Sequence, residues 1–219
     1  MDLQFTLEFL KDLAANNHKE WMDDNKKRYL MAKDNVIELV ADVLSEISHF
    51  DPALADLEPK KTLFRINRDI RFSKNKDPYK LNFGASIASG GRKSGNPGYY
   101  LNIQPNNTFV GGGLYQPSSD SLAKVRQEID YNGAQLRKVI DNESFKKYYD
   151  APYSEDKLKT APRGYPKDHP DLELLQLKHY VFMRSISDDE VVGNNFPQKV
   201  AEAFKALHPF NLFLMEALS

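Results

Sequence analysis

The sequence contains no cysteine, which excludes disulfides, thiolate metal sites, iron–sulfur clusters and cysteine nucleophiles. It also lacks any run of about 18 apolar residues, the length at which a helix begins to span a bilayer. The first residues carry acidic side chains and show no basic leader followed by an apolar stretch. We therefore expect a cytoplasmic protein with no membrane partner.

Several catalytic and cofactor signatures are absent as well. The triplet Gly111–Gly113 is not followed by Lys-Ser or Lys-Thr, so it is no P-loop, and neither G-x-G-x-x-G nor G-x-S-x-G occurs. These glycines indicate strand positions that another backbone or a ligand approaches closely, or a bulge. His169 and Asp171 with His179 or His208 imitate a two-histidine, one-carboxylate iron site, but the spacing is arbitrary. We predict no metal and no cofactor.

What is present suffices for a folded core. The chain has 219 residues, of which 41% are apolar and 11% aromatic, and we expect one domain over residues 1–219. Residues 5–50 show helical spacing, either as one long second helix from His18 or with a break near Asp34-Asn35. Pattern and turn residues then predict the following elements: strands at 62–67, 83–89, 98–104 and 108–115, helix over 120–149, a surface loop over 150–170, a strand at 179–186, and helices near 196–207 and 209–217.

Together these elements predict an α+β protein, in which an antiparallel sheet is covered by N-terminal and C-terminal helices. The short connections between the strands of residues 62–115 favour a meander, joined by the later strand at 178–186. The two C-terminal helices are expected to be separated at His208-Pro209, because proline lacks the N–H that a helix interior needs.

The distribution of charge points to a site for something anionic. Residues 60–93 hold ten Lys or Arg against the two acids Asp69 and Asp77, a local charge of +8. The rest of the chain therefore carries −9 to reach the total of −1. A near-neutral total argues against a protein that coats DNA, so any nucleic-acid role would depend on this one patch.

The basic stretch is built around Arg65, Arg68 and Arg71. Three guanidiniums repel one another unless carboxylates or a bound anion compensate them, and their planar forks suit phosphate and carboxylate oxygens. On a regular strand Arg65 and Arg68 would face opposite sides, so convergence needs a turn or bulge near Arg68-Asp69. The alternative is a set of salt bridges to the acidic helices.

The loop that follows carries lysines. Asp77-Pro78 starts a turn around which Lys74, Lys76 and Lys80 project. A lysine beside other cations has a lowered pKa and can act as a base or nucleophile, which makes Lys76 the first candidate; the alternative is a solvated charge.

Further residues extend the candidate site. Tyr99 and Tyr100 alternate across a strand, so one of them is expected to face the core and the other the site. Arg163, Tyr165 and His169 belong to a polar loop that can form a lid over the basic centre.

The motif R-x-x-R-D-x-R-F-x-x-N-K-x-x-Y, from Arg65 to Tyr79, resembles the defining motif of a mainly bacterial family catalogued as domain of unknown function 2461. The stretches from Glu20 to Tyr29, from Gly112 to Pro117 and from Pro162 to Tyr165 extend the resemblance over nearly the whole chain. The resemblance implies membership in that family and brings no activity with it.

From the residues we predict a concave pocket for a small ligand that bears phosphate or carboxylate, with Asp69 orienting one guanidinium. Should the pocket be catalytic, Lys76 or Asp69 would transfer the proton and the arginines would stabilise developing negative charge. The alternatives are a nucleic-acid or protein interaction module that uses the same patch, and a purely structural role. The predicted ligand-binding residues are Arg65, Arg68, Arg71, Lys74, Tyr79, Lys80, Tyr100, Gly112, Gly113, Arg163 and Tyr165.

Overall fold

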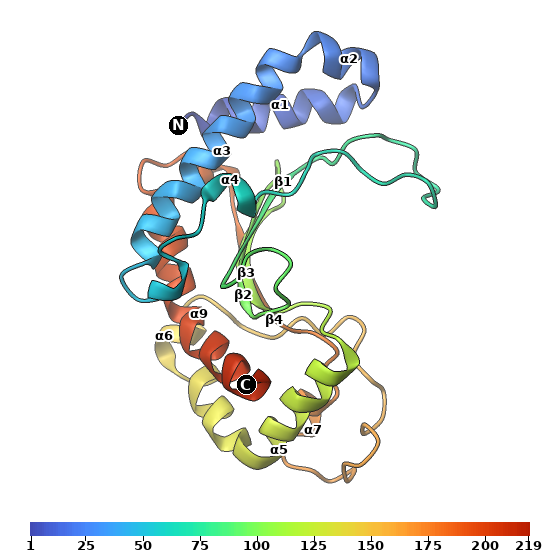
Figure 1. The fold of residues 1–219 in the computed structure, drawn as a ribbon, viewed down its shortest axis with the longest axis vertical. Coiled ribbons are helices and arrows are strands. Elements are labelled where there is room, and N and C mark those ends of the chain that lie inside the picture. Colours follow the sequence, from blue (N-terminus) through green and yellow to red (C-terminus); the bar gives the residue numbers. More distant parts are fainter.

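The structure, a computed structural model, describes residues 1–219. Helices from both ends of the chain flank a central group of strands (Figure 1). In chain order the elements are α1 (Leu3–Ala15), α2 (Lys19–Asp24), α3 (Lys26–Ile47), the 3-10 turn η1 (Pro52–Leu54), α4 (Pro59–Thr62), β1 (Phe83–Ala88), β2 (Gly98–Ile103), β3 (Thr108–Leu114), α5 (Ser119–Ile140), α6 (Glu143–Lys146), α7 (Leu172–Leu175), β4 (Tyr180–Ile186), α8 (Asp188–Val191) and α9 (Phe196–Leu218).

The four strands form one antiparallel sheet in the order β1-β2-β3-β4, which confirms the predicted meander. Phe83 opposes Ile103 and Ile87 opposes Tyr99, and all four side chains are buried. Since side chains alternate across a strand, these residues share one face of the sheet. We call it the inner face, and the opposite one the outer face.

Helices cover the inner face. In Figure 1, α3 and α9 run along one side of the sheet, α1 and α2 lie at one end, and α5 and α6 lie at the other. In α9, buried Phe204, Leu207, Phe210 and Leu214 recur at helical spacing, and burial of each such side chain contributes about 1.5–3 kcal/mol. Helices from both termini thus pack against the sheet, which confirms the predicted α+β architecture.

The predicted strand at 62–67 is wrong. Pro59–Thr62 form the helical turn α4 instead, and only Leu63 makes an isolated bridge to β1. Beyond that bridge the backbone pairs with a later part of its own segment. Lys80 N donates to Ile66 O at 2.8 Å, and Arg68 N donates to Pro78 O at 2.9 Å. This local pairing takes the place of a ladder with β1.

The boundaries of helices change in three regions of the chain. The two predicted C-terminal helices are one helix, α9, with Pro209 inside it. Both Pro209 and Lys205 are exposed, so the carbonyl that loses its N–H donor faces water. Near the N-terminus, α3 runs through Asn35 without a break, and the chain breaks at Asn25 instead. The helical region 120–149 divides into α5 and α6.

The outer face of the sheet is the side that the long helices leave free (Figure 1). Two irregular segments border it, residues 63–82 near α1 and α2 and residues 150–178 near α5. No helix combines the length and the apolar composition needed to cross a membrane.

Candidate functional site

Residues 65–80, which we call the arm, leave the sheet as a long loop and return to it (Figure 1). The base of the arm is fixed by Asn17, whose side chain donates to Tyr79 O at 3.0 Å and accepts from Tyr79 N at 3.1 Å. Tyr79 itself is buried in the core. At the tip, Phe72 is 95% exposed. The arm therefore has an anchored base and a solvent-exposed end.

Within the arm, Asp69 and Arg71 form a bidentate ion pair. Arg71 Nε lies 3.0 Å from Asp69 Oδ1, and Nη2 lies 2.7 Å from Oδ2. This hydrogen bonding lowers the pKa of the Asp69 carboxyl, because it favours the charged form. Both side chains are exposed.

Two other cationic side chains of the arm bind its own backbone. Arg68 donates to Asp77 O at 2.9 Å, and Lys76 Nζ donates to Ile70 O at 3.1 Å. Lys74 is exposed at the surface of the arm. Arg68 and Arg71 are thus bound within the arm, and of the three arginines only Arg65 lines the cavity described next.

That cavity, of about 260 Å³, lies where the arm joins α3, α4 and β1. We call it the cationic cavity, and it is lined by Tyr29, Lys33, Lys60, Leu63, Phe64, Arg65, Phe83 and Arg92. Four of these eight residues are cations and none is an acid. Arg71, Arg137 and Arg184 elsewhere each have a carboxylate partner, whereas none of the four cations in the cavity forms a salt bridge.

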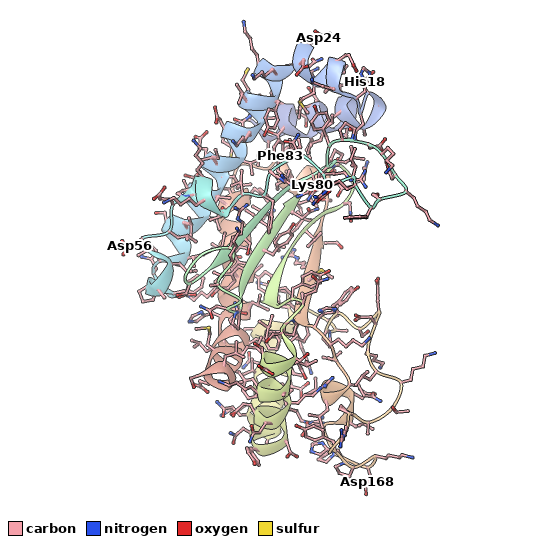
Figure 2. The ribbon with its side chains drawn as sticks, turned by 45° about the vertical axis from the view of Figure 1, so that its right-hand side comes forward. His18, Asp24, Asp56, Lys80, Phe83 and Asp168 are labelled. Atoms are coloured by element: carbon pink, nitrogen blue, oxygen red, sulfur yellow. The ribbon has the colours of Figure 1, made fainter.

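Lys80 adds a fifth cation beside the cavity. Its Nζ lies 5.3 Å from the centre of the Phe64 ring, and Arg92 Cζ lies 5.1 Å from the same centre. Burial lowers the pKa of Lys80, and the charges of Arg65 and Arg92 lower it further. Figure 2 places Lys80 and Phe83 at the same end of the sheet. The repulsion among these groups would fall if an anion bound between them.

A larger cavity of about 520 Å³, which we call the trough, covers the outer face of the sheet. Phe64 and Arg92 line both cavities, so the cationic cavity adjoins one end of the trough. The strands contribute Ser86, Ala88, Gly98, Tyr99, Tyr100, Phe109, Gly111, Gly112, Gly113, Leu114, Val181 and Met183 to its lining. Tyr115 and Tyr153 stand at its border.

The glycines of β3 are required by neighbouring backbone. A Cβ on Gly111 would overlap Phe182 O, and one on Gly112 would overlap Gly98 O and approach Leu207 of α9. Gly113 has a φ of 116°, a conformation that side chains disfavour. Close approach of another backbone, one of the alternatives that the sequence leaves open, is therefore observed at these glycines.

The structure places two of the predicted site residues elsewhere. Arg163 is exposed in the segment 150–178, and Tyr165 packs edge-on against His169 with ring centres 6.3 Å apart. His169 Nε2 lies 3.0 Å from Asp130 Oδ1 of α5. Figure 2 shows Asp168 of this segment at the lower end of the molecule, far from Lys80. These residues line neither cavity.

Sequence reasoning missed Lys33, Lys60, Arg92, Phe64 and Phe109. Lys60 and Arg92 are part of the +8 stretch but have no motif of their own. Lys33 follows Tyr29 by one helical turn, which places both on one side of α3. That spacing was the available signal.

No group of three or more His, Asp or Glu side chains is placed to hold a metal ion. The histidines whose sequence pattern imitates an iron site have different partners in the structure. His179 Nε2 lies 3.0 Å from Asp156 Oδ2, and His208 Nδ1 lies 2.8 Å from the hydroxyl of Tyr99.

The fold and the two cavities define an α+β protein whose open sheet face carries an aromatic trough with a cationic cavity at one end. A scan of protein families matches residues 5–213 to the family described as conserved hypothetical protein (DUF2461). The protein belongs to that family, as the resemblance of its arm motif predicts. Searches of curated proteins and of solved structures gave no significant match.

Proposed function

We propose that the protein binds a small metabolite through a phosphate or carboxylate group held in the cationic cavity. The observation that carries the proposal is the set of four lining cations without a carboxylate partner. Like charges held close together repel one another. A bound anion offsets this repulsion.

The four cations suit this role in different ways. Arg65 and Arg92 present planar forks that bind two oxygens of one phosphate or carboxylate at once, whereas Lys33 and Lys60 act as point charges. Arg92 is already held in place, since its Nη1 donates to Leu63 O at 2.6 Å. That bond reduces the side-chain freedom lost on binding.

The proposal is one of binding rather than catalysis. Asp69 and Lys76, the predicted proton-transfer residues, engage Arg71 and the carbonyl of Ile70, and neither lines the cationic cavity or the trough. The cationic cavity itself holds no carboxylate or imidazole that could serve as a general base.

Titration calorimetry and thermal unfolding with inorganic phosphate, pyrophosphate and citrate test the proposal. An anion present at a hundredfold excess over its Kd should raise the free energy of unfolding by about 2.7 kcal/mol. Arg65→Gln should abolish most of this gain. Arg71→Gln is the matched control, because it removes the same charge from the arm without altering a cavity wall. Equal responses of the two variants, or no response of the wild type, would refute the proposal.

A further inference from the structure

Three aromatic rings form a row across the outer face of the sheet. The ring centres of Phe64 and Tyr100 are 6.2 Å apart, and those of Tyr100 and Phe109 are 5.8 Å apart. The row starts at the base of the arm, crosses β2 and reaches β3. All three rings line the trough. Because Lys80 and Arg92 both lie over Phe64, the row begins at the cationic cavity.

The ring of Tyr100 lies along the sheet. A Cβ on Gly84 would overlap the Tyr100 hydroxyl, so the ring covers Gly84 rather than standing upright from the strand. Burial raises the pKa of Tyr100, and its hydroxyl therefore stays protonated near neutral pH. A ring in this position, with the Phe109 ring beside it at an interplanar angle of 32°, offers an aromatic surface to a ligand.

Next to the row, glycines leave several positions on the floor of the trough without a side chain. Gly98 pairs with Gly113, and Tyr100 pairs with Gly111, while Val181 and Met183 of β4 project from the same face beside them. A flat group can therefore lie against the strands at these glycines, bordered by the side chains of β4. The polar groups on this floor are few, and the hydroxyls of Ser86 and Tyr100, which oppose each other across β1 and β2, have no hydrogen-bond partner in the protein.

We propose that the trough receives a planar aromatic ring covalently linked to the anion, so that the ligand has the chemistry of a nucleoside monophosphate. The ring stacks on Tyr100 and packs against Phe109, and the phosphate lies in the cationic cavity. This inference rests on the proposed function and specifies its ligand class. The volume of about 520 Å³ lies within the range of about 300–1,000 Å³ typical of small-molecule sites.

A sugar phosphate without a base fits this surface less well. A sugar carries many hydroxyls that need partners when they are buried, and the trough supplies few. A base presents one flat face for stacking and a small number of polar atoms at its edge. The free hydroxyls of Ser86 and Tyr100 beside an aromatic surface suit a base, with its few polar edge atoms, better than a sugar.

Calorimetry with adenosine monophosphate and ribose 5-phosphate at one ionic strength tests the inference. In the wild type the nucleotide should bind at least about tenfold more tightly, the factor expected from stacking of one base. Phe109→Leu should remove this preference and leave ribose 5-phosphate unchanged, whereas Phe109→Tyr should keep it. Tyr131→Leu, at an exposed aromatic residue of α5, is the control for loss of a ring. Arg65→Gln should weaken both ligands.

The outcomes separate this inference from the proposed function. If the two ligands bind equally and Phe109→Leu alters neither, the aromatic ring is refuted, while weaker binding by Arg65→Gln still supports an anion site. If neither ligand nor inorganic phosphate binds the wild type, both the proposed function and this inference are refuted.

Discussion

At the scale of single residues, Lys80 reports on the cationic cavity. Its pKa lies below that of an ordinary lysine, first through burial and then through Arg65 and Arg92. We predict that Arg65→Gln raises this pKa but leaves it below the ordinary value, because the burial remains. Titration of the lysine side chains by nuclear magnetic resonance checks this. Arg68→Gln is the control, since that guanidinium binds the carbonyl of Asp77, and an equal shift in both variants would contradict the geometry of the cavity.

The same pKa has a consequence for stability. Because Lys80 binds its proton less tightly in the folded state than in the unfolded state, protonation costs stability. The free energy of unfolding should therefore rise as pH rises through the folded-state pKa, towards the unfolded value near 10.4. This rise should be smaller in Arg65→Gln.

Single residues also show what the sequence can predict about the site. Local density of charge and the arm motif identified Arg65 and Lys80, which lie at the cationic cavity. They could not separate these residues from Arg68, which binds its own loop. Charge density and the motif could not identify Lys33 either, because this residue lies on α3, outside the basic stretch of residues 60–93. Which cations converge is decided by tertiary packing, which spacing along the chain does not encode.

At the scale of elements, the contact of β3 with β2 and α9 depends on Gly112. We predict that Gly112→Ala lowers the free energy of unfolding by about 3 kcal/mol, as overpacking in a close-packed site does. The added Cβ would overlap Gly98 O and approach Leu207. Gly95→Ala is the control: it has a φ of 76° but open space around it, so only the backbone strain of about 1 kcal/mol applies. Urea unfolding measures both, and equal losses would refute the packing argument.

Most of the strands and helices could be predicted from the sequence. Period-two patterns and turn residues placed β1 to β4 and their meander, because each strand buries one face. The strand predicted at 62–67 failed since its β-forming residues pair within the arm. The break predicted at Pro209 failed because buried residues on both sides, such as Phe204 and Phe210, hold one continuous helix against the sheet. In both cases, non-local packing or a competing local pairing outweighed residue preference.

At the scale of the whole molecule, the charge is divided between +8 in residues 60–93 and −9 elsewhere. Several cations of the arm are held by the arm's own groups, which leaves few of them to bind a long polyanion. We predict that a short single-stranded oligonucleotide binds no more tightly than a mononucleotide.

Fluorescence anisotropy between about 50 and 200 mM salt checks this, since each phosphate contact on a single strand adds about −0.7 to the slope of log K against log salt. One anchored phosphate group predicts a slope of about −0.7. Lys74→Glu, at the exposed surface of the arm, should leave that slope unchanged, whereas Arg65→Gln should weaken binding at every salt concentration. A slope steeper than about −3 that Lys74→Glu reduces would show that a nucleic-acid backbone follows the arm. The basic patch would then be an interaction surface rather than the entrance to a small-molecule site.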